Sequence, residues 1–165
     1  MASSRTKGLA AAATLFGGLL AGVSANRSLV QIPAWKRIGA APWAAFTRAE
    51  NHGLGALFYP AIGLAALLFT AATAIAFRFD RAARGSRSFP VYSAAVVAVA
   101  WAVATRGFVV PALFSLGEVG NNAVELQRLL LSLARWWAIN DVLHALSFGL
   151  NLWALSEVLS SSKGN

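Results

Sequence analysis

The chain has 165 residues, of which 58% are hydrophobic and 12% charged, and its formal net charge is +8. Four long apolar segments use most of this length, which leaves no material for a separate soluble domain. The sequence contains no cysteine, which excludes disulfides, thiolate metal sites, iron–sulfur clusters and cysteine nucleophiles. These properties predict one membrane domain that spans residues 1–165.

The four apolar segments are long enough to cross a bilayer, whose hydrocarbon core of about 30 Å needs roughly 20 helical residues. The predicted spans cover about residues 8–25, 53–77, 89–114 and 136–157. The first segment also resembles a signal peptide, because Arg5 and Lys7 precede it, but we expect it to be retained. The predicted fold class is all-α: an integral membrane four-helix bundle with an interfacial loop between helices 1 and 2.

The predicted loop, residues 26–52, mixes apolar residues with basic ones and contains Trp35 and Trp43. We expect it to lie along the membrane interface with both tryptophans at headgroup depth. Trp136 and Trp137, at the start of the fourth span, are predicted to be the matching anchors.

Basic residues gather at the ends of the spans and form no groove-binding module, so we expect lipid headgroups, and no nucleic acid, as their partner. Four of them lie in the short loop between the second and third spans: Arg78, Arg81, Arg84 and Arg87. The positive-inside rule then predicts a multi-pass protein with this loop and both termini in the cytoplasm. The other face of the membrane is expected to carry the same number of basic residues, seven, as this one.

Two short stretches resemble each other. The first runs from Arg27 to Pro33 after the first span, and the second from Arg106 to Pro111 at the end of the third. A duplicated helix pair would place both turns on the same side of the membrane. Chance similarity between apolar segments is the alternative.

Polar residues recur at three- and four-residue spacing through the fourth span: Asn140, Asp141, His144, Ser147 and Asn151. A charged residue in hydrocarbon is costly, so Asp141 requires a partner or a function. Because successive spans alternate in direction, Arg27, His52 and Arg106 are expected at the same face of the membrane as this cluster.

Several interpretations of the cluster remain open. In a structural one, Arg106 neutralises Asp141 while His144 and Asn140 bond to neighbouring groups. In a functional one, Asp141 and His144 are a catalytic acid–base pair that takes a proton from a lipophilic acid. In a third, His52, Asp141 and His144 hold a metal. Proton or solute translocation is the fourth.

The functional interpretation, which assigns no metal, makes His144 and Asp141 the candidate catalytic residues. The surrounding polar cluster, which would hold substrate or fasten the helices, then consists of Arg106, Asn140, Asn151, Arg27 and His52. No motif identifies a cofactor, and a bound quinone, haem or pigment would leave none in a groove of apolar residues.

Loose motifs run through most of the chain, from about Leu19 to Leu155. They are Ala21-Gly22, Val30-Gln-Ile-Pro33-Ala-Trp35, Phe46, Tyr59-Pro60, Thr105 to Pro111, and Arg135-Trp-Trp-Ala-Ile-Asn140. In these features the chain resembles the family of small four-helix membrane proteins that includes the anthrone oxygenases. The positions that match the family pattern are Pro33, Pro111, Trp137 and Asn140. The chain departs from it at Ala112, where a polar residue is usual, and at His144, where an arginine is expected.

The resemblance implies a four-helix membrane bundle and, in the characterised branch, oxygenation of an anthrone to an anthraquinone without an evident cofactor motif. We therefore expect a cofactor-poor oxygenase that acts on a hydrophobic aromatic small molecule through the His144 and Asp141 pair. The alternative is a non-catalytic subunit that docks onto a larger membrane complex or forms a homo-oligomer. A cavity beside His144 favours the enzyme, whereas a filled cluster with Arg106 on Asp141 favours the subunit.

Overall fold

The computed structural model describes residues 2–80, 87–120 and 122–160, and every regular element in these ranges is helical. The elements in chain order are α1 (Ser4–Asn26), η1 (Arg27–Gln31), α2 (Ile32–Ile38), α3 (Ala40–His52), α4 (Gly55–Phe79), α5 (Phe89–Ala104), η3 (Thr105–Val109), α6 (Val110–Glu118) and α7 (Ala123–Ser160). η1 and η3 are π-helical turns. Arg81 and Arg84, on which the predicted cytoplasmic face partly depends, lie outside the described residues.

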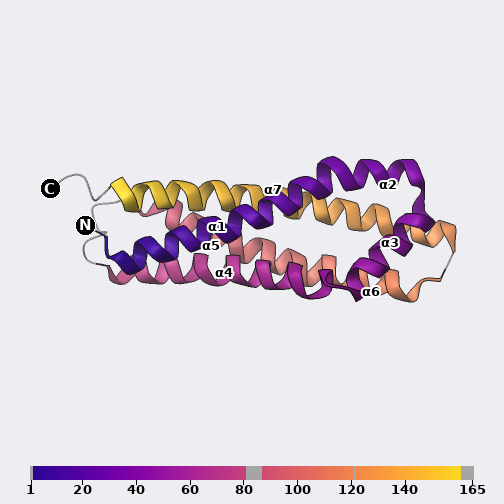
Figure 1. Ribbon diagram of the computed structural model, residues 1–165, viewed down its shortest axis with the longest axis horizontal. Coiled ribbons are helices and arrows are strands. Elements are labelled where there is room, and N and C mark those ends of the chain that lie inside the picture. The colour runs from indigo at the N-terminus through magenta and orange to yellow at the C-terminus, as the bar shows by residue number, and fades with distance from the viewer. Residues whose placement is uncertain (1, 81–86, 121, 161–165) are drawn as a thin grey trace.

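Four long helices lie side by side in an elongated bundle (Figure 1). α1, η1 and α2 run on as one helix of 35 residues, and α5, η3 and α6 as one of 30 residues. With α4 and α7, they are long and apolar enough to cross a membrane. The prediction of an all-α chain with four long apolar helices is confirmed. The helices extend beyond the predicted spans. α7, for example, begins at Ala123, whereas the predicted fourth span begins at about residue 136.

α1 begins and α4 ends at the same end of the bundle (Figure 1), where they are joined by Asp80, the residue just after α4. Its Oδ2 accepts hydrogen bonds from the Ser3 backbone N–H at 2.7 Å and from Thr6 Oγ1 at 2.8 Å. Ser3 also caps α1, because its Oγ accepts from the Thr6 N–H at 3.2 Å. α1 therefore begins where α4 ends, as four helices of alternating direction require.

The segment expected as an interfacial loop is helical, which corrects the prediction. α2 and α3 are separated by Gly39 alone, whose φ of 93° makes the sharp turn between them. α3 then packs against the first turns of α7 and against α6. We call α2, α3, α6 and residues 123–135 of α7 the cap.

The cap has an apolar core of its own. Trp35 and Trp43, expected at headgroup depth, are only 3% and 6% exposed there. They pack with leucines of α6 and α7: Leu116, Leu126 and Leu130. Contacts with distant segments therefore bury both tryptophans in protein, and their depth at the membrane interface stays a prediction.

Each π-helical turn lies just before a proline. The Ile32 N–H donates to the Arg27 carbonyl before Pro33, and the Val110 N–H donates to the Thr105 carbonyl before Pro111. A proline lacks the N–H for the usual helical bond and its ring clashes with the carbonyl four residues earlier, so a wider turn relieves both problems. Aligned on these prolines, the two stretches match without a gap, and Arg27 then corresponds to Thr105.

Candidate functional site

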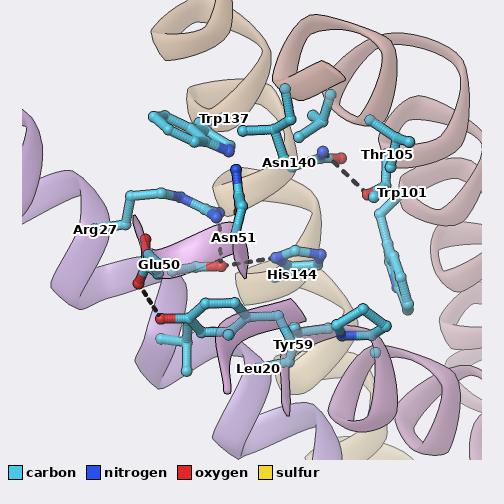
Figure 2. Close-up of a pocket in the computed structure, with 18 of the residues that line it drawn as sticks. Leu20, Arg27, Glu50, Asn51, Tyr59, Trp101, Thr105, Trp137, Asn140 and His144 are labelled. Atoms are coloured by element: carbon cyan, nitrogen blue, oxygen red, sulfur yellow. Dashed lines mark hydrogen bonds between the residues drawn. The ribbon is translucent and has the colours of Figure 1, made fainter. Parts of the chain in front are cut away.

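A cavity of about 480 Å³ lies where the four long helices meet the cap (Figure 2). Most of its wall is apolar and includes Leu20, Leu67, Trp101 and Leu113. Both π-helical turns contribute residues to the wall, as expected for turns on the same side of the bundle. This volume falls in the range of small-molecule sites and has room for a fused aromatic ring system.

His144 lies in the wall of the cavity and is 6% exposed. Its Nδ1 is 2.7 Å from Ser24 Oγ on α1. Its Nε2 is buried and finds no hydrogen-bond partner in the described part of the chain. The Trp101 ring meets the imidazole edge-on, with ring centroids 5.0 Å apart. One ring nitrogen is thus held by Ser24, whereas the other has no partner among the described residues.

Asp141 is paired with Arg27, which corrects the expectation that Arg106 neutralises it. Arg27 Nη2 donates to Asp141 Oδ1 in an ion pair, and Ser28 Oγ donates to Oδ2. Arg106 lies at the exposed rim of the cavity. The reason is the direction of the carboxylate: Asp141 faces α1 and η1, whereas its neighbour Asn140 faces η3.

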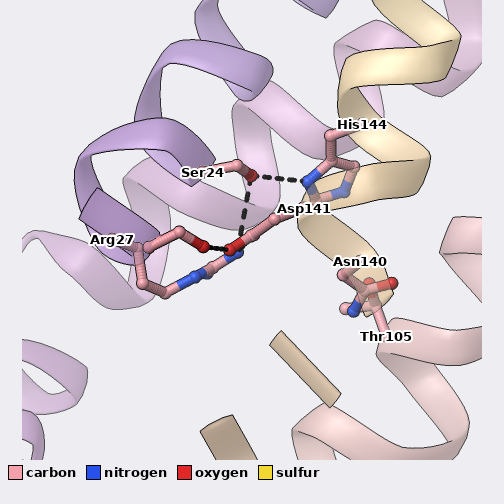
Figure 3. Close-up of polar contacts among 7 residues, drawn as sticks. Ser24, Arg27, Thr105, Asn140, Asp141 and His144 are labelled. Atoms are coloured by element: carbon pink, nitrogen blue, oxygen red, sulfur yellow. Dashed lines mark hydrogen bonds and ion pairs between the residues drawn. The ribbon is translucent and has the colours of Figure 1, made fainter. Parts of the chain in front are cut away.

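The expected direct pairing of Asp141 with His144 is replaced by an indirect link (Figure 3). Arg27 Nη2 bonds Asp141 and also donates to Ser24 Oγ at 3.4 Å, and Ser24 in turn contacts His144. The guanidinium of Arg27 also lies 5.2 Å from the ring centroid of Trp137, which is buried and does not act as an exposed anchor. Ser24 is the link that the sequence does not predict.

Asn140 is 2% exposed and lines the cavity one turn away from His144. Its Nδ2 donates to Thr105 Oγ1 at 3.2 Å, on the first residue of η3. Its Oδ1 is buried without a partner among the described residues. Three residues that line the cavity therefore each carry a buried polar atom without a partner among the described residues: Arg27 at Nε, Asn140 at Oδ1 and His144 at Nε2.

His52 and Asn151 do not join this site. His52 is exposed at the end of α3, so His52, Asp141 and His144 are not brought together. No group of three or more His, Asp or Glu residues in the described ranges could hold a metal. Asn151 lies deeper in the bundle, 3% exposed, where its Nδ2 donates to Thr70 Oγ1 at 3.1 Å.

α3, which belongs to none of the four long helices, closes one side of the cavity. Glu50 on α3 accepts a hydrogen bond from Tyr59 on α4 at 2.7 Å, and both residues line the cavity. Arg48 fastens the other side of α3 to α6, donating to the carbonyls of Leu116 at 3.0 Å, Gly120 at 3.1 Å and Val119. No sequence motif marks these residues as parts of one site.

No protein-family model matches the sequence, and no curated protein or solved structure is significantly similar to it.

Proposed function

We propose that this chain is an integral membrane enzyme of the anthrone-oxygenase type, which takes a hydrophobic aromatic substrate from the bilayer and oxidises it with molecular oxygen. The observation that supports this proposal above all is the cavity beside His144, which has a mostly apolar wall and whose lining residues carry three buried polar atoms without a partner among the described residues. Apolar sites with a few convergent polar groups are the usual form of small-molecule sites.

Charge spacing supports the membrane placement. α1 has no charged residue between Lys7 and Arg27, which is about 30 Å of helix at 1.5 Å per residue. The third long helix has none between Arg87 and Arg106, a similar length. Both distances match the hydrocarbon core of a bilayer. Large apolar side chains point outward between these levels, such as Ile75 at 61% and Val96 at 69% exposed.

This placement puts the cavity at one edge of the hydrocarbon core, since Arg27 and Arg106 both line it. The cap then lies in the headgroup region, above the cavity. An apolar molecule could enter from the acyl chains without crossing water, while its polar atoms meet His144 and Asn140 near the interface. A lipophilic aromatic ketone has this division of apolar and polar parts.

The proposed reaction converts a ring methylene of such a ketone to a second carbonyl. One O₂ is consumed, one of its oxygen atoms enters the product, and the other leaves as water with the two methylene hydrogens. The chain would bind and orient the substrate, with the ring plane against Trp101 and an oxygen at His144. A filled cluster would favour the alternative of a structural subunit, but here the space beside His144 is open and Arg27 holds Asp141.

The test combines two measurements. Native mass spectrometry of the protein released from its own membrane should reveal a bound aromatic molecule. In lipid nanodiscs, anthrone should cause oxygen uptake above the protein-free rate, with anthraquinone as product. His144→Phe should lose both, while Val142→Ala, an exposed position on the same helix, should keep both. A larger protein assembly without a small ligand or oxygen uptake would refute the proposal and support the subunit.

A further inference from the structure

His144 is held by a chain of polar contacts that begins at Asp141 and passes through Arg27 and Ser24 (Figure 3). We infer that this chain fixes the neutral imidazole with its proton on Nε2, so that the cavity selects a ligand with a carbonyl or phenolate oxygen beside His144. The inference rests on the proposed function and names the chemistry that its ligand must have. It also replaces the predicted role of His144 as a base by that of a hydrogen-bond donor.

The direction of each hydrogen follows from the donors available. A guanidinium can only donate, so Ser24 Oγ accepts from Arg27 Nη2. The positive charge of Arg27 turns the lone pairs of the hydroxyl toward itself and its hydrogen away. That hydrogen is then left for Nδ1 of His144, 2.7 Å from the same oxygen. A neutral imidazole that accepts at Nδ1 carries its proton on Nε2.

Asp141 is linked to His144 through this chain. Its two oxygens accept from Arg27 and Ser28, which holds the guanidinium beside Ser24. Arg27 is further oriented by the face of Trp137. The direction of the Ser24 hydroxyl hydrogen is thus fixed by the positive charge of Arg27, which the surrounding helices hold in position. This is expected for a site that is preorganised before the ligand binds.

Nε2–H of His144 is consequently a buried donor without an acceptor among the described residues, on a side chain that lines the cavity. Leaving such a group unbonded is unfavourable, so a ligand oxygen at this point gains affinity that a hydrocarbon cannot. Asn140 Oδ1, one turn away, is an unbonded acceptor suited to a ligand hydroxyl, because its amide nitrogen already donates to Thr105. The donor on His144 suits the carbonyl oxygen of a planar aromatic ketone or quinone. The acceptor on Asn140 suits a hydroxyl on the same ring system.

The probes are fluorenone and fluorene, which differ only by a carbonyl in place of a methylene. Binding to the protein in nanodiscs is measured by titration calorimetry. The wild type should bind fluorenone about tenfold more tightly than fluorene. His144→Gln, whose amide N–H replaces Nε2–H, should keep most of this preference, and His144→Phe should abolish it. Ser24→Ala should reduce it about threefold or more, because the tautomer is no longer fixed.

Ser147→Ala is the matched control for Ser24→Ala. Ser147 is also a buried serine, one of the polar residues that recur along α7, but it does not line the cavity. The preference for fluorenone should therefore be unchanged in Ser147→Ala. A readout independent of ligand is ¹⁵N NMR of histidine-labelled protein. The chain has two histidines, so a His52→Asn background leaves His144 as the single signal. The expected spectrum has a protonated Nε2 and an unprotonated Nδ1, and Ser24→Ala should mix the two tautomers.

The outcomes separate the two proposals. If fluorene and fluorenone bind equally, or if Nδ1 carries the proton, the inference about His144 is overturned while the ligand-binding cavity stands. If neither probe binds to the folded wild type, the cavity is not a site for aromatic ligands and both proposals fail. Retention of the fluorenone preference in His144→Phe would also overturn the inference.

Discussion

Arg27 and Asp141 are 114 positions apart in the chain and form an ion pair where the π-helical turn η1 meets the middle of α7. Their side chains are 19% and 10% exposed. The same guanidinium reaches Ser24 and lies over Trp137. One residue therefore joins two helices and orients the contact of His144, so its removal should affect both stability and ligand preference.

Arg27→Met should lower the free energy of unfolding by about 3 kcal/mol, because it leaves the Asp141 carboxylate buried without its counter-charge. The double variant Arg27→Met/Asp141→Leu should be less destabilised than Arg27→Met alone, since no unpaired charge remains. The free energy of unfolding of each variant is measured by titrating the protein in detergent micelles with a denaturing detergent.

Arg106→Met is the matched control for this pair. Like Arg27, Arg106 lies in a π-helical turn that precedes a proline, and it lines the cavity. Unlike Arg27, it lies at the exposed rim. Its replacement should change the free energy of unfolding by less than about 1 kcal/mol. An equal loss at both arginines would show that the Arg27 and Asp141 pair has no special part in stability.

Asn151 and Thr70 should behave as a structural pair that is independent of the site. Asn151→Leu leaves the buried Thr70 hydroxyl without its partner on α7 and should cost about 2 kcal/mol of unfolding free energy. Adding Thr70→Val should recover much of that loss, because an apolar pair leaves no unsatisfied group. Ligand affinity should be unchanged in both, since neither residue lines the cavity. Loss of ligand binding in a folded Asn151→Leu would instead extend the site toward this level of the bundle.

The four long helices are predictable because length and uninterrupted apolarity are local properties. The cap is not, because the same mixture of Trp35, Trp43 and basic residues suits an interfacial segment and a packed helix pair equally. What decides between them is contact with Leu116 and Leu126, which lie about 80 positions further along the chain. The sequence pattern contains no measure of that contact.

The polar cluster is predictable in its members but not in its pairs. Spacing on α7 and the alternation of the spans bring Asn140, Asp141, His144 and Arg27 to one level. Which arginine meets Asp141 depends on the rotation of each helix about its axis, and the π-helical turns change that rotation. Aligning the two stretches on Pro33 and Pro111 would have paired Arg27 with Thr105 and indicated that each turn meets α7 through its first residue.

Filling the cavity from α4 should weaken ligand binding without harming the fold. A Cβ at Gly63 would lie 3.8 Å from the Trp101 ring, which is ordinary contact, and a longer side chain would enter the cavity that Gly63 lines. Gly63→Leu should therefore reduce the affinity for fluorenone about tenfold, because the added group takes space that the rings need. Helix propensity should offset any packing cost, at about 1 kcal/mol in favour of leucine.

Gly149→Leu is the control for Gly63→Leu. Gly149 is exposed on α7, and a Cβ there would meet nothing within 4 Å. This variant should have the same gain in helix propensity and unchanged ligand affinity. If Gly63→Leu binds fluorenone as well as Gly149→Leu does, the ligand does not occupy the space between α4 and Trp101.

The hydrogen bond between Tyr59 and Glu50 should control how fast ligands enter and leave, because it joins α3 of the cap to α4 at the cavity wall. Tyr59→Phe removes one hydrogen bond, with a cost of about 1 kcal/mol to the closed arrangement. Association and dissociation of fluorenone should both accelerate about threefold to tenfold, while the equilibrium affinity changes little. Stopped-flow tryptophan fluorescence measures both rates. Unchanged rates would place the entry route elsewhere.

Gly55 should be indispensable to that same junction. A Cβ at Gly55 would come within 2.7 Å of the Glu50 backbone carbonyl, closer than real contacts allow, so α3 must move away from α4 in Gly55→Ala. A Cβ at Gly53 would meet the Ala49 carbonyl at 3.4 Å, which needs little adjustment. Gly55→Ala should therefore lower the free energy of unfolding by about 1–3 kcal/mol and accelerate ligand exchange at least as much as Tyr59→Phe does. Gly53→Ala should do neither, and hydrogen exchange of the α3 amides should rise only in Gly55→Ala. If the two alanine variants behave alike, close packing of the α3 end on α4 does not hold the cavity closed, and the entry route must be sought on the α6 side, where Arg48 fastens the cap.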